Sequence, residues 1–218
     1  MLWLLISFCF LWMVYRELRN PLLELSEFST FDVGYVLVLL LMACAFAWPP
    51  VSNWRFERRL SQIASQLAER PDVSVHCNSA FDAIFDNEIN VAGHANPETG
   101  EIVLQHSWCG KLIDYLAQPE HASDEISWSM SLFVHEAMHA RGELVESKTE
   151  CQAIQRRVQA ERLLGVPAPI AAKNATHYYE NLYWQRHPYF APECSAGGAM
   201  DERLAGWSWP IVRAKSRH

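Results

Sequence analysis

The sequence has little glycine, no excess of proline and no excess of positive charge. Its 218 residues include 9 Gly and 11 Pro, and no segment has low complexity or collagen-like spacing. We find no internal repeat of roughly 20 to 50 residues, so the length is that of one globular domain, with or without appendages. The 18 Lys and Arg are outnumbered by 25 Asp and Glu, which gives a formal net charge of −7. Because no cationic field exists to hold a polyanion, we expect no nucleic acid as a partner.

The first quarter of the chain is far more apolar than the remainder. Val33 to Val51 is a run of 19 residues without a charge, and about 20 residues are needed to cross a hydrocarbon core as a helix. Trp48 and Trp54 mark the end of the run, and three arginines follow between positions 55 and 59. Aromatic and basic residues of this kind are typical of a membrane interface, so the run predicts a transmembrane helix.

A second apolar run of 15 residues, Met1 to Tyr15, is closed by Arg16. A signal peptide is the alternative interpretation, but it requires a basic start and a small-residue cleavage site, and neither is present before Asn20. We therefore expect residues 1–54 to form a transmembrane helical hairpin that anchors the chain in the lipid bilayer, followed by a soluble domain over residues 55–218.

Two spans place the N-terminus and the soluble domain on the same side of the membrane, and two features of the sequence disagree on which side. The loop between the spans carries two arginines and the stretch after the second span carries three, so the positive-inside rule favours the cytoplasm. The soluble part contains an even number of cysteines, which suits two disulfide bridges in an oxidising compartment: Cys77, Cys109, Cys151 and Cys194. Scattered free thiols are the alternative.

Hydrophobic spacing and turn residues predict mainly helices in the soluble part. The spacing over 54–69 is helical, 73–77 alternates like a short strand, and 89–92 and 101–105 flank the turn-rich segment HANPETG as strands of a β-hairpin. A short helix is expected over 79–87, and longer helices over 107–118, 123–142, 144–164 and 167–186. The predicted fold class is therefore α+β, a mostly helical domain with a short β-hairpin or small sheet.

The segment Val134 to Gly142, VHEAMHARG, contains the motif HExxH. His135 and His139 are about 40° apart on one helical face, so both imidazoles can reach one metal ion. Zinc at a catalytic site takes three protein ligands and a water, and Glu136 beside it can accept the proton of that water and pass it to a leaving amine. Two surface histidines on a helix are the alternative, but with 9 His in 218 residues the motif is improbable by chance.

A third zinc ligand is expected from the next helix, which offers Glu143, Glu146 and Glu150. Gly142 ends the histidine helix, so the chain reverses and the first inward carboxylate, that of Glu146, lies nearest the metal. Glu150 is one helical turn further on, where it can accept the other N–H of a ligand histidine, and it is the alternative ligand. Both glutamates could also be ordinary solvated charges.

These residues resemble the zincin metallopeptidases, and among them the gluzincins, whose third ligand is a glutamate on the next helix. Glu146 and Glu150 in ESKTE fit the paired glutamates of that group. The resemblance implies Zn²⁺ as the cofactor and a strand, a hairpin and a helix before the motif. It also implies hydrolysis of peptide bonds in a protein or peptide substrate, with Glu136 as the catalytic general base.

Residues from about Val73 to Asp201 also resemble small bacterial membrane-anchored proteins in which paired cysteines follow HExxH. The segments that carry this second resemblance are HARGELVESKTECQA and YFAPECSAGGAMD. It implies the disulfides Cys77–Cys109 and Cys151–Cys194, and hence an extracytoplasmic domain at the bacterial inner membrane. It implies no substrate.

A stretch rich in tyrosine lies on the helix expected over 167–186. Zincins commonly stabilise the oxyanion of the reaction with a downstream tyrosine or histidine, and His177, Tyr179 and Tyr183 are the candidates here. Core packing is the alternative for each of them.

The function predicted from these features is that of a membrane-anchored zinc metallopeptidase. The alternative is a membrane-tethered zinc-binding module without turnover, acting in envelope assembly. An intramembrane protease is disfavoured because neither apolar run contains the HExxH motif.

Overall fold

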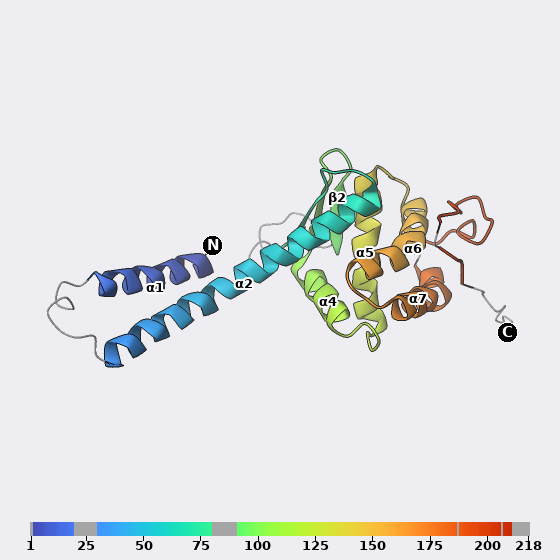
Figure 1. Ribbon diagram of the computed structural model, residues 1–218. Helices are drawn as coiled ribbons and strands as arrows, with labels where there is room; N and C mark the ends of the chain where they lie inside the picture. The colour runs from blue at the N-terminus through green and yellow to red at the C-terminus, as the bar shows by residue number, and fades with distance from the viewer. Residues whose placement is uncertain (1, 20–29, 80–90, 187, 206, 211–218) are drawn as a thin grey trace. The chain divides into compact units, whose positions relative to one another are not determined.

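Helices form most of the protein, together with a small three-stranded sheet (Figure 1). The computed structural model describes residues 2–19, 30–79, 91–186, 188–205 and 207–210. The chain divides into two units, Met1–Phe56 and Glu57–His218, which we call the N-terminal unit and the C-terminal unit. The predicted α+β class with dominant helices is confirmed.

The N-terminal unit contains α1 (Leu2–Leu18) and the first part of α2 (Thr30–Ala68). The two helices are in contact, because the Ser7 hydroxyl donates a hydrogen bond to the Ala43 carbonyl over 2.8 Å. In the described part of the chain, the α2 segment Phe31–Ala68 is the one helix long and apolar enough to cross a membrane. Because α1 has only 17 residues, the second span of the expected hairpin stays a prediction.

The sheet of the C-terminal unit contains β1 (Ser74–Cys77), β2 (Gly93–Asn96) and β3 (Glu101–Leu104). The strand order is β1-β3-β2, with β3 parallel to β1 and antiparallel to β2. The helix expected over 79–87 lies outside the described residues except at its first position.

The hairpin of β2 and β3 is shifted from its predicted position. Its first strand begins at Gly93, so part of the expected loop HANPETG is strand. The Asn96 side-chain oxygen accepts hydrogen bonds from the backbone N–H of Glu98 (2.9 Å) and of Thr99 (3.2 Å). The chain therefore reverses only after Asn96, and Gly100 completes the turn with a φ of 74°.

Helix α5 (Asp124–Arg141) occupies the centre of the C-terminal unit and packs against α4 (His106–Ala117), α6 (Glu146–Leu163) and the sheet (Figure 1). Its two ends are as predicted. The Ser123 hydroxyl caps the first turn, and Gly142 follows the last turn with a left-handed φ of 111°. The end of α2 contributes further apolar side chains to the core of this unit: Leu60, Ile63 and Leu67.

The last predicted helix is interrupted. Helix α7 (Ala168–His177) is followed by a π-helical turn (Tyr178–Leu182) and a 3-10 turn (Tyr183–Gln185). Residues five positions apart in an α-helix point in directions about 140° apart, whereas the wider π turn places Tyr178 and Tyr183 in one buried cluster. Both tyrosines pack there with Cys151 and Ile154 of α6, and no local sequence pattern encodes such contacts.

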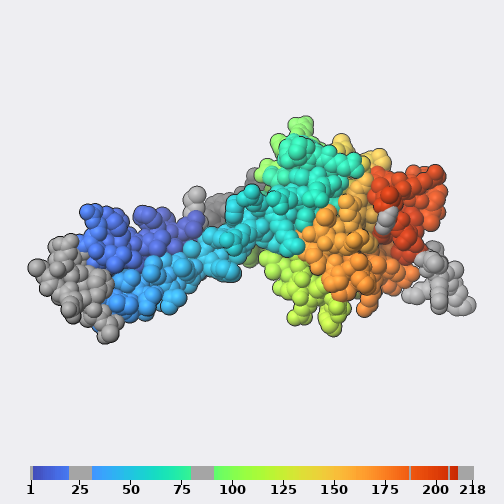
Figure 2. Space-filling model, in the orientation of Figure 1, coloured from blue at the N-terminus to red at the C-terminus, as the bar shows by residue number. Residues whose placement is uncertain are grey.

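Two pairs of cysteines lie at disulfide distance, and they are the predicted pairs. The Cα atoms of Cys77 in β1 and Cys109 in α4 are 5.8 Å apart, and those of Cys151 in α6 and Cys194 are 5.5 Å apart. Residues 188–205 lie against α6 (Figure 2), where the Gln155 side chain donates to the Met200 carbonyl over 2.9 Å. The second pair therefore ties the C-terminal segment to α6.

Candidate metal centre

The HExxH residues lie on the last turns of α5, inside the C-terminal unit. His135 and Glu136 are each 5% exposed, and His139 is half-buried. Gly142 reverses the chain directly after these turns, and its backbone N–H donates back to the His139 carbonyl. Helix α6 then begins at Glu146, so its first turn lies beside the two histidines.

One side-chain atom from each of His135, His139 and Glu146 meets at a single place, and these atoms lie within 4.8 Å of one another. Oε2 of Glu146 is 3.1 Å from Nε2 of His135 and 3.4 Å from Nε2 of His139. The Glu146 side chain is 49% exposed, so the cluster borders solvent on the side of this carboxylate. Two imidazoles and a carboxylate form a donor set that suits Zn²⁺.

The hydrogen-bond partners of the two imidazoles determine which nitrogen of each ring is free to bind a metal ion. Nδ1 of His139 is 2.7 Å from the carbonyl oxygen of Glu143, which can only accept, so Nδ1 is the donor. Nδ1 of His135 is 2.8 Å from Oε2 of Glu150 and donates to that carboxylate. In the neutral form of both rings, Nε2 therefore carries the lone pair on the side of Glu146.

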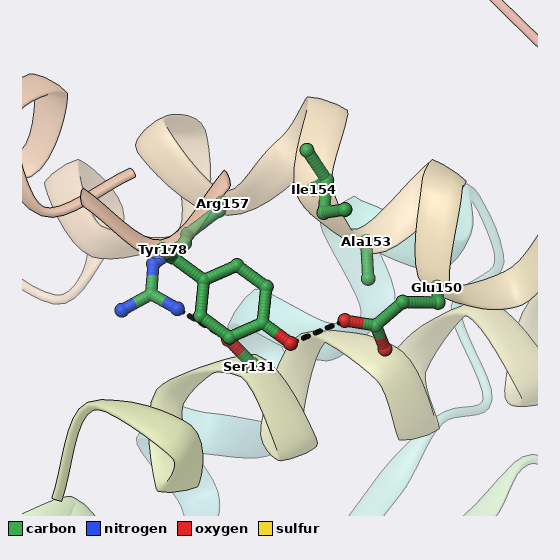
Figure 3. Close-up of a pocket in the computed structure, with 6 residues that line it drawn as sticks. All are labelled: Ser131, Glu150, Ala153, Ile154, Arg157 and Tyr178. Carbon is green, nitrogen blue, oxygen red and sulfur yellow. Dashed lines mark hydrogen bonds between the residues drawn. The ribbon is translucent and has the colours of Figure 1, made fainter. Parts of the chain in front are cut away.

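Glu150 is fully buried and lies behind His135, on the Nδ1 side of the ring. Its other oxygen, Oε1, accepts a hydrogen bond from the Tyr178 hydroxyl over 2.5 Å (Figure 3). Burial alone would raise the pKa of Glu150, but the hydrogen bond from His135, the charge of Arg186 and the Tyr178 hydroxyl together lower it. Glu150 is thus an ionised carboxylate that orients His135, whereas Glu146 reaches the cluster itself.

Negative charge accumulates around His135. Burial alone would lower the pKa of His135, but the hydrogen bond to Glu150 and the charges of Glu150, Glu136 and Glu146 raise it. Burial is the main reason that the pKa of Glu136 is raised to about 7. The charge of His135 lowers this pKa, and the charges of Glu146 and Glu150 raise it further. A cation bound in this field would be stabilised by the same carboxylates.

Strand β2 lies directly against Glu136. A Cβ atom at Gly93 would be 3.6 Å from Cγ of Glu136 and 3.0 Å from both a Leu104 methyl carbon and the Val103 carbonyl oxygen. Glycine therefore lets the backbone of β2 approach the helix closely. In the described part of the sheet, β2 is an edge strand, and Glu136 lies against its residue Gly93.

The structure gives the three expected oxyanion-stabilising residues other partners. The Tyr179 hydroxyl donates to the Cys194 carbonyl over 2.9 Å, and the Tyr183 hydroxyl donates to the Ala191 carbonyl over 3.2 Å. The Tyr183 ring belongs to the buried cluster around the Cys151–Cys194 pair, and the Tyr179 ring packs against it. The role of both tyrosines is therefore core packing, the alternative to oxyanion stabilisation. His177 lies at the surface, with Nε2 2.9 Å from the Asp124 carboxylate.

Tyr189, which the sequence pattern did not single out, lies at the cluster instead. Its ring centroid is 5.5 Å from that of His135 in an edge-on arrangement, and the Arg186 guanidinium is 4.8 Å from the Tyr189 ring centroid. Burial, followed by the charge of Glu146, raises the pKa of Tyr189, so its hydroxyl is protonated and able to donate at neutral pH. Its one sequence signal is its place in the segment YFAPEC, shortly before Cys194.

The fold and the site together define a mostly helical domain in which two neighbouring helices bring two histidines and a glutamate to one point. No family model matches the chain, and no match was found among curated proteins or solved structures.

Proposed function

We propose that the protein is a membrane-anchored zinc metallopeptidase of gluzincin-like arrangement, in which His135, His139 and Glu146 hold Zn²⁺. The observation that carries this proposal is the convergence of two Nε2 lone pairs and one carboxylate oxygen at 3.1 and 3.4 Å. Tetrahedral zinc with bonds of about 2.0–2.1 Å places neighbouring ligand atoms roughly 3.3–3.4 Å apart. The distances from Glu146 to the two histidines are therefore close to the spacing that the ion requires, and all three ligand atoms lie within 4.8 Å of one another.

The other residues of the site have properties that suit hydrolysis. Bound zinc supplies Lewis acidity and lowers the pKa of water towards neutrality. In the metal-free protein, burial raises the pKa of the Glu136 carboxyl to about 7. Beside a zinc-bound water, this carboxylate would accept a proton from the water and pass it to the leaving amine. The Tyr189 ring lies beside His135 and Arg186, and in this proposal its hydroxyl donates a hydrogen bond to the oxyanion of the reaction.

A peptide substrate is favoured by the position of β2. An extended peptide can add a strand to a sheet edge through backbone hydrogen bonds. Because Gly93 of β2 lies against Glu136, a peptide paired with this strand would have its backbone close to the carboxylate. The substrate class we propose is accordingly a protein or peptide in extended conformation.

The Glu136→Gln variant tests this function. It removes the proton-accepting group but none of the proposed metal ligands, so purified full-length protein in detergent should retain about one zinc per chain in metal analysis. Cleavage of a proteome-derived peptide library should fall by roughly 10²- to 10⁴-fold relative to the wild type. Zinc in both proteins with cleavage in neither would instead support a tethered zinc-binding module that acts in envelope assembly.

The location we propose is the bacterial inner membrane, with the C-terminal unit outside the cytoplasm. The large apolar side chains of α1 and α2 are mostly exposed, including Phe8 at 65% and Leu41 at 69%, and a lipid bilayer would cover such a surface. Two cysteine pairs at disulfide distance in the C-terminal unit suit an oxidising compartment.

A further inference from the structure

A buried polar layer lies behind the proposed metal ligands, and Tyr178 is at its centre (Figure 3). The two carboxylate oxygens of Glu150 have different partners. Oε2 is 2.8 Å from Nδ1 of His135, and Oε1 accepts the hydrogen bond of the Tyr178 hydroxyl over 2.5 Å. A single carboxylate therefore connects the π-helical turn to the ring of His135.

Tyr178 is itself held from several directions. Its hydroxyl accepts a hydrogen bond from Arg186 at 3.4 Å, and the Arg157 guanidinium lies 4.8 Å from its ring centroid. Arg157 is in turn fixed by a hydrogen bond to the hydroxyl of Ser131 and by an ion pair of 2.8 Å with Glu161. The tyrosine is only 1% exposed, so its hydroxyl has a single well-defined position from which to donate.

The hydrogen bond from Tyr178 limits how Glu150 can rotate. The terminal torsion of a glutamate has a broad, nearly two-fold energy profile, so a carboxylate with one partner can turn about that bond. With Oε1 held by Tyr178, Oε2 remains in line with Nδ1 of His135. The plane of that imidazole, and with it the direction of its Nε2 lone pair, is then determined by the tyrosine.

We propose that Tyr178 is a positioning residue which, through Glu150, orients His135 and so increases the affinity of the site for zinc. This inference rests on the proposed metal centre and adds to it a residue that touches neither metal nor substrate. The competing interpretation is that Tyr178 only fills the core, since it belongs to the buried cluster around Cys151.

Tyr183 provides a matched control. It is a second buried tyrosine in the same cluster, and its hydroxyl is also satisfied, because it donates to the Ala191 carbonyl (3.2 Å) and accepts from the Ala191 N–H (2.9 Å). Tyr178→Phe and Tyr183→Phe each remove one buried hydroxyl and leave the ring in place. Only the first change removes a partner of Glu150.

The experiment compares full-length wild type, Tyr178→Phe and Tyr183→Phe in detergent. The zinc dissociation constant is measured by competition with a chromophoric chelator, and the melting temperature is measured on metal-free protein. We expect both variants to melt slightly below the wild type, and only Tyr178→Phe to bind zinc roughly 10-fold more weakly or worse. Equal zinc affinity in the two variants would overturn the inference while leaving the metal centre intact, and a wild type without zinc would overturn both.

A double-mutant cycle tests whether the effect passes through Glu150. If it does, Tyr178→Phe should change zinc affinity much less in a Glu150→Gln background than in the wild type. An undiminished effect in that background would show that Tyr178 does not act through this carboxylate.

Discussion

Glu146 and Glu150 lie one helical turn apart, yet their surroundings differ, and this makes their proposed roles separable. Glu146→Ala should abolish tight zinc binding with little change in the stability of metal-free protein, because the Glu146 side chain is 49% exposed. Glu150→Ala should weaken zinc binding by roughly 10- to 100-fold. It should also destabilise the metal-free protein, because the buried partners His135 and Tyr178 would each lose a hydrogen bond worth about 1–3 kcal/mol when left unpaired.

Zinc dissociation constants and thermal unfolding of metal-free protein measure these two effects independently. If Glu150→Ala lost zinc completely and Glu146→Ala kept it, the third ligand would have to be reassigned to Glu150.

Tyr189 is the residue to which we assign the oxyanion-stabilising role expected of a downstream tyrosine. Tyr189→Phe should reduce kcat by about 10²- to 10³-fold, as the loss of one oxyanion donor does, while the zinc content is unchanged. Tyr179→Phe is the matched control, since the Tyr179 hydroxyl donates to the Cys194 carbonyl and should not affect kcat. Steady-state kinetics and metal analysis of both variants decide the point, and similar kcat values for the two would remove Tyr189 from the site.

Among the elements, the reversal between α5 and α6 determines where Glu146 lies relative to the histidines. Gly142 has a φ of 111°, a conformation that side chains disfavour, so Gly142→Ala should destabilise the protein by about 1–2 kcal/mol. It should also weaken zinc binding, because any change in the turn moves the start of α6. Gly110→Ala in α4 is the control: its Cβ would meet nothing within 4 Å, so it should stabilise the helix by about 0.5–1 kcal/mol. Chemical denaturation should show that the free energy of unfolding falls in Gly142→Ala and rises in Gly110→Ala. A stabilising effect of Gly142→Ala would contradict the argument about the turn.

Elements defined by local signals were predictable, whereas those defined by tertiary packing were not. Helix α5 carries its own capping residue and glycine stop, so the sequence predicts both ends and the common face of His135 and His139. The position of β2 depends on the side chain of Asn96 bonding its own backbone, which the alternation of residues does not reveal. The π turn at Tyr178 packs on residues of α6, and Tyr189 reaches His135 from a distant part of the chain.

In the molecule as a whole, the apolar residues are exposed in one unit and buried in the other. In the N-terminal unit they cover the outside of α1 and α2, and in the C-terminal unit they fill a core around α5. The core of the C-terminal unit also contains ionised groups, among them Glu150 and Arg157, which require hydrogen bonds to remain buried. The Cys151–Cys194 pair lies directly beside this polar interior, because Cys151 follows Glu150 in α6.

The last prediction concerns the two cysteine pairs and the side of the membrane on which they lie. Removal of a native disulfide from a small exported domain costs about 2–5 kcal/mol, so Cys151→Ser should lower the melting temperature clearly. It should also weaken zinc binding, because Cys151 follows Glu150 in α6 and its partner Cys194 holds the segment that carries Tyr189. Cys44→Ser, at an exposed free cysteine of α2, is the control and should change neither quantity.

Alkylation of thiols in intact cells, followed by non-reducing peptide mapping, should recover the bridged peptides Cys77–Cys109 and Cys151–Cys194 and no alkylation at these four positions. Four alkylated thiols in the C-terminal unit would instead indicate a reducing compartment, because bridges do not persist where glutathione and thioredoxin keep thiols reduced. The domain would then lie in the cytoplasm, as the count of arginines around the spans favours. The zinc centre would remain possible on either side, since none of its three proposed ligands is a cysteine.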